Sequence, residues 1–530
     1  MNTASFPRSE RSMNRKVRSS IPRPTLARVI AGFLVTLSLG GCVVGPNFTE
    51  PDRPHEQRYV PENSAVIGSA GSSEVEQHVS MGDKLPSNWW TSLHSPELNH
   101  TVEMALAKNW SIDIAQANLA KASEGIAVAR GGLLPQVDGG ASGGRQSYGA
   151  SFLGPEAFTF PTFSAYSGGI TLSYDLDVFG GQKRRVEYAA ADAQVQGEVL
   201  NAVHLSVAGE TVLIALQIAS IRAQMQVVDG VVASDEQNLA LVKAAHDTGV
   251  ATLMDVTTAQ SQLDSDRALR PPLRQQLNVG QDALATLVGK SPGEWNAPNF
   301  DLDNFTLPQD IPLAVPSDLV RARPDIRAAE AQLHAASAEV GIATADMYPH
   351  ISLSGGIAEQ GLFSGPSGAA WNFVGGIAGP IFHGGSLSAH RRAAQDAYRA
   401  SFAQYQQTVL TSFRQVADNL HGLSNSADEV KSQQQALDSA SAALRLTRQG
   451  YSVGNAGVVQ VLDVQRLQQL AELRLVQART TRFVDTVGLY LATGGGLADS
   501  AVTAGQGRAN GQDASAPVAS EQAVDYGPSR

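Results

Sequence analysis

The chain has 530 residues with 39 basic and 50 acidic side chains, which gives a formal net charge of −11 at pH 7. This acidic balance argues against nucleic acid, a polyanion, as a partner. The sequence contains a single cysteine, so an intrachain disulfide is excluded and the surroundings of that cysteine become informative.

The first 41 residues have the pattern of a secretory signal peptide. Seven Arg and Lys residues precede an apolar run over residues 29–41, and this run ends in two glycines. That run is too short to cross a bilayer as a helix. We therefore predict a signal peptide over residues 1–41, with either Met1 or Met13 as its first residue. Its removal takes away more positive than negative charge and leaves a more acidic chain.

Cys42 directly follows this leader. The stretch Leu39-Gly40-Gly41-Cys42 resembles the bacterial lipobox, and the resemblance implies that Cys42 carries diacylglycerol. Each buried methylene of an acyl chain contributes about 0.8 kcal/mol to membrane attachment. Because Cys42 is followed by Val and not Asp, the resemblance also implies onward export to the outer membrane. The alternative is an ordinary signal peptide with an incidental cysteine.

The remaining sequence contains the same order of parts twice. Each half has a helical pattern, a strand pattern, a very long helix, a glycine-containing turn and another helix. The turns at Gly249 and Gly454 lie at matching places in the two halves. The predicted organisation is an extended anchored segment over 42–87, a first repeat over 88–291, a connector over 292–317, a second repeat over 318–496 and a disordered tail over 497–530.

Two segments without proline, residues 182–248 and 386–453, predict exceptionally long helices. At 1.5 Å per residue each reaches roughly 100 Å. In the first, residues from Thr211 to Val242 form a ladder with alternating steps of three and four, the spacing of a coiled coil, and Asp235 is its one acidic exception. Such helices need partner helices along their whole length, as in the wall of a tube.

The segments between these helices alternate like β-strands. In residues 170–176 the alternate positions are Ile, Leu, Tyr and Leu, and residues 351–357 and 371–377 alternate in a similar way. No segment after the leader has the roughly 18 consecutive apolar residues of a transmembrane helix, so a membrane crossing would use strands. Transmembrane barrels need at least about eight strands, so several chains would contribute. A soluble antiparallel sheet with one wet face is the alternative.

Four motifs closely resemble outer-membrane factors of the NodT type, which are lipoprotein relatives of TolC. The most specific is Arg-Pro-Asp-Ile-Arg-Ala-Ala-Glu at 323–330; the others are Asn-Trp-Trp at 88–90, Tyr-Asp-Leu-Asp-Val-Phe-Gly at 174–180 and Gly-Pro-Ile-Phe at 379–382. The resemblance covers about residues 42–496. It implies a mixed α and β fold of the TolC type. Four strands from each of three chains would form a twelve-stranded transmembrane β-barrel, continued by a long α-helical coiled-coil periplasmic barrel.

The same resemblance assigns the gate to the periplasmic helix tips at Gly249 and Gly454. Tyr451 takes the position of a tyrosine that latches the second hairpin to the first in TolC, and Asp255 takes the position of the aspartate that receives the latch. The companion arginine position holds Ala456, which predicts a looser latch.

TolC also places two acidic rings near its constriction. Asp463 matches one of them, whereas the other position is Gln460. We therefore predict a single ring of three Asp463 carboxylates, which would attract cations in the pore. The alternative for Asp463 is an ordinary solvated carboxylate on a helix surface, and for Tyr451 an aromatic side chain that only packs.

No pattern in the sequence predicts chemistry. The Gly-x-Ser-x-Gly pattern of hydrolases occurs at 140–144, but in a glycine-rich strand or loop instead of a strand-to-helix turn. Asp175 and Asp177 lie on one side of a strand end, which favours a structural role over a metal pair. The eleven histidines form no cluster with ligand spacing. We expect no enzyme activity, no cofactor and no metal site.

The predicted function is an outer-membrane channel of a tripartite system that exports small toxic compounds such as drugs, organic compounds or metals. By the resemblance, the partners are two further copies of the chain, outer-membrane lipid, a periplasmic adaptor and an inner-membrane transporter. One alternative is the outer-membrane duct of an ABC-type protein secretion system. Another is a structural periplasmic coiled-coil lipoprotein or a pump adaptor.

Overall fold

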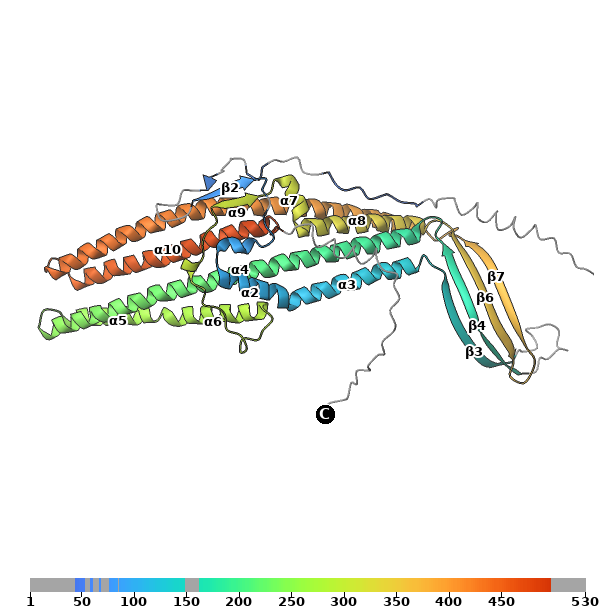
Figure 1. Ribbon diagram of the computed structural model, residues 1–530, viewed down its shortest axis with the longest axis horizontal. Coiled ribbons are helices and arrows are strands. Elements are labelled where there is room, and N and C mark those ends of the chain that lie inside the picture. Colours follow the sequence, from blue (N-terminus) through green and yellow to red (C-terminus); the bar gives the residue numbers. More distant parts are fainter. Residues whose placement is uncertain are drawn as a thin grey trace, which may run out of the picture.

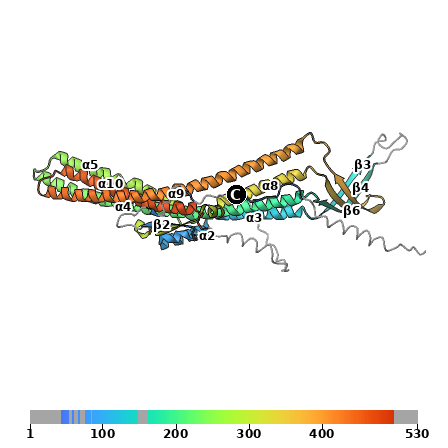
Figure 2. The ribbon, with the colours of Figure 1, turned by 90° about the horizontal axis from the view of Figure 1, so that it is seen from above.

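The computed structural model describes residues 43–52, 58–60, 66–67, 76–83, 85–147 and 162–496. The predicted signal peptide, Cys42 and the predicted tail lie outside these residues. Figure 1 shows an elongated body in which a four-stranded sheet lies at one end and helices run lengthwise from it. Two helical hairpins end together at the opposite end, and Figure 2 shows the same arrangement from above.

The two halves of the chain contain matching elements. The first half contains η1 (Trp89–Leu93), α2 (Pro96–Lys108), α3 (Trp110–Gly131), β3 (Gln136–Gln146), β4 (Phe163–Leu176), α4 (Gly181–Asp247), α5 (Leu253–Arg267) and α6 (Arg270–Leu287). The second contains α7 (Pro316–Ala322), α8 (Pro324–Ala345), β6 (His350–Leu362), β7 (Ser367–Ala378), α9 (Ser386–Ser452) and α10 (Val458–Ala492). The remaining short elements are β1 (Val66–Ile67), β2 (Gln77–Met81), η3 (Leu302–Asn304) and β5 (Asp310–Leu313).

The two long helices predicted from the absence of proline are confirmed. α4 and α9 each contain 67 residues. Both follow a glycine in the left-handed conformation, Gly180 with φ 76° and Gly385 with φ 85°, which lets the chain turn from strand to helix without Cβ strain. α4 packs against α3 and α8 near the sheet, and against α5, α6 and α10 further along the body.

One stretch of α4 is long and apolar enough to cross a membrane by length and composition alone, with a mean hydropathy of 1.7. Counting consecutive apolar residues misses it, because polar residues interrupt the run. In the structure 44% of that stretch is buried, and neighbouring helices surround it. The central helix of a helical bundle has this composition.

The largest apolar core lies midway along the body, where η1, α2 and the connector meet α4 and α10. Trp89, Leu93 and Tyr490 are almost completely buried there, and the ring centroids of Trp89 and Tyr490 lie 5.6 Å apart. Burying a large apolar side chain contributes about 1.5–3 kcal/mol. This core therefore ties the two halves together at mid-length.

A small sheet beside this core was not predicted. Residues expected only to be extended form β2, which pairs in parallel with β5 from the connector, Val79 opposite Ile311. Gln77 on β2 accepts a hydrogen bond from the buried Arg482 of α10 over 3.1 Å. The strands are short and more than 200 residues apart, so local periodicity gives no signal for them.

The four-stranded sheet has the order β3-β4-β6-β7 and is antiparallel throughout. Its register places Ile170, Ile357 and Trp371 directly opposite one another across three strands. Residues directly opposite each other share a face of the sheet. Thr171, Gly356 and Asn372 make the adjacent row on the other face. The predicted alternation is thus confirmed, with one apolar face and one small or polar face.

Candidate functional site

The first hairpin turns between α4 and α5. After α4 ends, Gly249 adopts a left-handed conformation with φ 78°, and its N–H donates to the carbonyl of His246 over 2.9 Å. Thr252 then caps α5. The N–H of Asp255 donates to Thr252 Oγ1 (3.2 Å), and the Asp255 carboxylate accepts from the N–H of Thr252 (2.8 Å). This reciprocal pair is a capping box, which satisfies two backbone donors at the helix start.

The capping box engages the carboxylate predicted to receive the latch. The hydroxyl of Thr252 also donates to Asp255 Oδ2 over 2.7 Å. The bonds from the Thr252 N–H and hydroxyl lower the pKa of Asp255. Among the described residues no hydrogen bond joins Asp255 to Tyr451. Asp255 is therefore bonded within its own hairpin, and its role in a latch stays a prediction.

The second hairpin turns between α9 and α10. Gly454 has φ 79°, and its N–H donates to the carbonyl of Tyr451 over 3.1 Å. The Tyr451 side chain is 36% exposed on the last turn of α9. Gly457 precedes α10 and supplies no side-chain cap. Both predicted tip glycines thus lie where the chain reverses direction.

Both tips carry exposed apolar side chains. On the first, Val250 is 83% exposed and Met254 73% exposed; on the second, Val453 is 69% exposed. Apolar side chains grouped on an otherwise polar surface mark sites of protein contact. The tips therefore have the composition of a docking surface.

Asp463 lies on α10, the helix that leads away from the second tip. Its neighbour Leu462 is buried with Leu239 and Leu263 in an apolar cluster that joins α10 to the first hairpin. Consecutive residues of an α-helix point roughly 100° apart. Asp463 accordingly points to a different side of α10 from Leu462 and is exposed to solvent. This position allows both the pore-facing and the solvated-surface interpretation.

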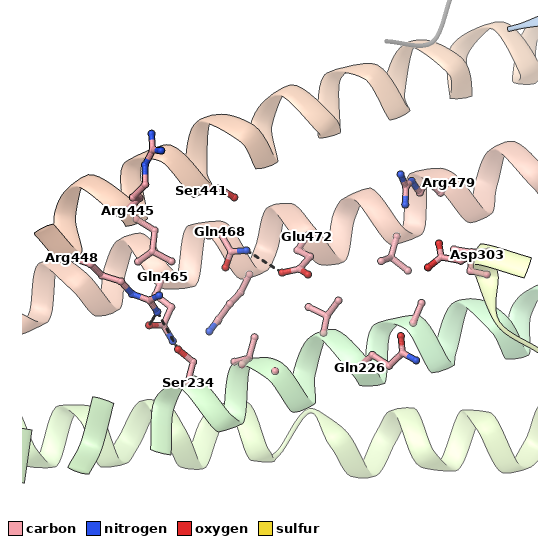
Figure 3. A pocket seen from close by; sticks show the side chains of 18 of the residues that line it. Gln226, Ser234, Asp303, Ser441, Arg445, Arg448, Gln465, Gln468, Glu472 and Arg479 are labelled. Carbon is pink, nitrogen blue, oxygen red and sulfur yellow. Dashed lines mark hydrogen bonds between the residues drawn. The ribbon is translucent and has the colours of Figure 1, made fainter. Parts of the chain in front are cut away.

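A groove runs between the two hairpins above the tips, with a volume of about 890 Å³ (Figure 3). Residues of α4, α9 and α10 line it, and Asp303 of the connector lies at its far end. Its polar lining residues include Arg445, Arg448 and Glu472. Such a mixed polar surface suits a protein partner better than an apolar ligand.

A hydrogen-bonded cluster joins the two hairpins at this level, and the sequence did not reveal it. Gln465 donates from Nε2 to Asp235 Oδ1 (2.7 Å) and accepts at Oε1 from Asn238 (2.7 Å) and Arg448 (3.2 Å). Arg448 also donates to Ser234 Oγ over 3.1 Å. The only sequence signal was the acidic Asp235 within an apolar ladder.

The structure also locates the residues that the sequence analysis considered and rejected as catalytic or metal-binding candidates. Residues 140–144 lie inside β3, so they form no strand-to-helix elbow. The Asp177 carboxylate accepts backbone N–H bonds from Gln182 (2.8 Å) and Lys183 (2.9 Å) and so caps the first turn of α4. Asp175 Oδ2 lies 3.9 Å from His350 Nδ1, and both side chains are exposed. In the described ranges no three His, Cys, Asp or Glu side chains form a group that could hold a metal.

The family to which the chain belongs follows from its similarity to known proteins. The outer membrane efflux protein family matches residues 101–290 and 315–495. These segments make up most of the chain, so it belongs to the outer membrane efflux protein family.

Individual proteins similar to this chain support the same family assignment. Outer membrane protein OprJ of Pseudomonas aeruginosa is 28% identical over 473 residues, which cover 88% of this chain and 95% of OprJ. The cation efflux system protein CusC of Escherichia coli is 27% identical over 469 residues, which cover 88% of this chain and 98% of CusC. The solved structure of the outer-membrane channel OprN matches with a TM-score of 0.75 at 26% identity, covering 86% of this chain and 99% of OprN.

The chain is therefore an outer-membrane efflux channel component of tripartite pumps, with a TolC-like mixed α and β fold and a periplasmic portion. The predicted family, fold class and outer-membrane location are confirmed. Its relatives are efflux channels and not enzymes, which confirms the prediction that the chain is not an enzyme. Membership of this family also contradicts the alternative of a structural coiled-coil lipoprotein or pump adaptor.

Proposed function

We propose that three copies of this chain form one channel, which carries small toxic compounds out through the outer membrane. Assembly from several copies is supported by the two open edges of the four-stranded sheet. Within the described residues, β3 and β7 each pair on one side only. Unpaired backbone groups cost several kcal/mol each in a bilayer, so a sheet there must close on itself. β7 of one copy would pair with β3 of the next.

The two faces of the sheet suit this closure. Trp371, Phe373 and Ile377 of β7 are all exposed in the single chain. On the outside of a barrel they would contact lipid, and the row of Thr171, Gly356 and Asn372 would face the lumen. The resemblance to TolC sets the number of copies at three, which gives twelve strands.

The start of the described chain supports a lipid anchor on Cys42. Arg184 on the first turn of α4 is buried and donates to the carbonyl of Val44 (3.3 Å) and to Asn47 Oδ1 (2.9 Å). Phe48 stacks on His334 of α8 with ring centroids 4.4 Å apart. These contacts hold the segment after Cys42 next to the junction between sheet and helices. An acylated Cys42 would then enter the lipid beside the barrel.

The gate of this channel would lie at the hairpin tips. Three Asp463 carboxylates would surround the narrowest part of the pore and attract cations. Tyr451 would contact the first hairpin near Asp255 in the closed state, and Ala456 would weaken that latch by its lack of a charged side chain. A periplasmic adaptor and an inner-membrane transporter would engage the apolar tips and the groove between the hairpins, and would move the tips apart.

Planar-bilayer conductance tests the channel and its acidic ring together. Asp463→Asn should weaken cation preference and divalent block, because it removes three negative charges from one constriction. Gln460→Glu adds three carboxylates one turn away and should strengthen both. Absence of channel activity in the wild type contradicts the duct, and unchanged ion selectivity in both variants contradicts the acidic ring.

In-cell crosslinking followed by mass spectrometry tests the partners and the cargo class. Recovery of a proton-driven transporter with its adaptor supports export of small compounds. Recovery of an ABC exporter instead would replace this proposal with protein secretion.

A further inference from the structure

Two aspartates from different helices are buried beside each other inside the first hairpin. Asp235 on α4 is 2% exposed and Asp266 on α5 is 7% exposed. The Asp266 carboxyl lies within hydrogen-bonding reach of Asp235. Asp235 is also the acidic exception in the ladder of α4. A charged residue in such a ladder costs stability unless its environment compensates for it.

The hydrogen bonds around these carboxyls leave one oxygen unsatisfied. Asp235 Oδ1 accepts from Gln465 Nε2 of α10 over 2.7 Å, and Asp266 Oδ2 accepts from Gln262 Nε2 over 2.8 Å. Asp235 Oδ2 has no donor within the part of the chain that the structure describes. A proton placed between the two carboxyls would supply the missing donor.

The charged groups on the surrounding helices do not neutralise the pair. Arg448 on α9 donates to Gln465 (3.2 Å) and Ser234 (3.1 Å) and reaches Asp235 only through Gln465. Glu236 on α4 and Arg267 on α5 pair with each other at 2.6 Å, both half exposed.

Further charges lie on the outer surfaces of their helices. Asp264 on α5 and Arg466 on α10 are both exposed. Arg270 of α6 pairs with Asp229 of α4 at 3.1 Å, and both side chains are about half exposed. In the described ranges, neither Asp235 nor Asp266 has a cation as an ion-pair partner within 4 Å. Two carboxylates in this position cannot both be charged cheaply.

Burial, and then the hydrogen bond and charge of Asp266, raise the pKa of Asp235 to about 7. The ordinary value is 3.8. At the acidic end of the neutral range Asp235 therefore holds a proton that a solvated aspartate would have lost.

We propose that Asp235 and Asp266 share one proton and form a pH-responsive clasp between α4 and α5, which Gln465 extends to α10 of the second hairpin. Loss of the proton leaves two negative charges side by side in a contact that excludes water, and α5 then loosens from α4. The clasp is tightest in acid. It requires neither Asp463 nor Tyr451, so it stands apart from the proposed gate.

The linkage between proton binding and opening gives the sign and size of the pH dependence. The closed hairpin binds this proton up to about pH 7, whereas the opened hairpin loses it near the ordinary value of 3.8. Between these limits the equilibrium for opening α5 increases up to about tenfold per pH unit. Above about pH 7 both states have lost the proton and the dependence ends.

Hydrogen–deuterium exchange of the purified full-length protein tests this clasp. Protection of the amides in α5 is measured between pH 5 and pH 8, after correction for intrinsic exchange rates. In the wild type we expect protection to fall steeply between pH 5 and 7 and to level off above. Asp235→Asn replaces the shared proton with an amide donor, so its protection should not depend on pH over this range.

The matched control is Glu236→Gln, which removes one charge from the next residue of the same helix. It should keep the pH dependence of the wild type. Asp266→Asn removes the other half of the clasp and should flatten the profile, which provides a second test if Asp235→Asn does not fold. A flat wild-type profile, or an unaltered slope in both aspartate variants, would overturn the clasp.

Discussion

The two hairpins share an order of parts, yet their return helices differ. The first hairpin returns in two pieces, α5 with 15 residues and α6 with 18, which are separated at residues 268–269. The second returns in one piece, α10 with 35 residues. Pro271 and Pro272 account for the break, because proline is tolerated in the first turn of a helix but removes a hydrogen bond from its interior.

The difference extends to the side chains that hold each hairpin. In the first, the Thr252–Asp255 capping box and the buried pair of Asp235 and Asp266 all serve its internal contacts. In the second, a continuous helix follows an uncapped turn, and Asp463 is exposed. The first hairpin thus combines an interrupted return helix with carboxyl groups that bond within it, whereas the second combines a continuous return helix with an exposed carboxylate.

The largest expected effect comes from the apolar cluster that both hairpins share. Leu263 of α5 is buried there against residues of α4 and α10. Leu263→Ala should lower the free energy of opening the tips by about 2–5 kcal/mol, since it leaves a cavity in a packed contact. Amide exchange in α5 and α10 measures this.

The control for this prediction is Leu241→Ala on α4, where the side chain is 61% exposed. It should change the same free energy by less than about 0.5 kcal/mol. If the effect of Leu263→Ala is confined to α5, the cluster does not couple the two hairpins.

A smaller effect is expected at the cap of the first tip. Thr252→Ala removes the capping box and should destabilise the first turn of α5 by about 1 kcal/mol. Because its bonds lower the pKa of Asp255, the cap is present above the ordinary carboxyl pKa and is lost as the pH falls below about 4. Exchange in α5 should show this loss at low pH in the wild type and not in the variant. Equal protection in both at pH 7 contradicts the role of the cap.

The smallest effect is a gain at the second tip. Gly457 has an extended backbone with φ −84° and ψ 160°, and a Cβ placed there meets no atom within 4 Å. Gly457→Ser supplies the missing cap and should stabilise the start of α10 by a few tenths of a kcal/mol. Slower amide exchange over residues 458–461 measures the gain. A loss of protection there would mean that the second turn depends on glycine.

The parts of the fold that local patterns encode were predictable. The absence of proline predicted the length of α4 and α9, and the alternation of apolar with small or polar residues predicted β4, β6 and β7. The β2–β5 pairing was missed because its strands are short and distant in sequence. The break before α6 had a visible signal in Pro271 and Pro272, which the prediction of a single return helix overlooked.

For the candidate site, the sequence predicted which residues lie at the tips but not which side chains they contact. Gly249 and Gly454 lie at turns, which their conformational freedom explains. The partners of Asp235 were not predictable, since Asp266 and Gln465 come from two other helices. The roles of Tyr451 and Asp463 rest on the resemblance to TolC and stay predictions.

Disulfide scanning of the two sheet edges tests whether the sheet closes between copies. A cysteine at Ala141 on β3 is combined in turn with cysteines at alternate positions of β7, and outer membranes are oxidised. Within one chain the two edges lie three strand spacings, roughly 14 Å, apart, which is too far for a disulfide.

We expect one register of these pairs to yield covalent dimers and trimers, whereas Ala141→Cys combined with cysteines along the inner strand β6 should yield none. Monomers alone at every register of β7 would show that the sheet does not close between copies.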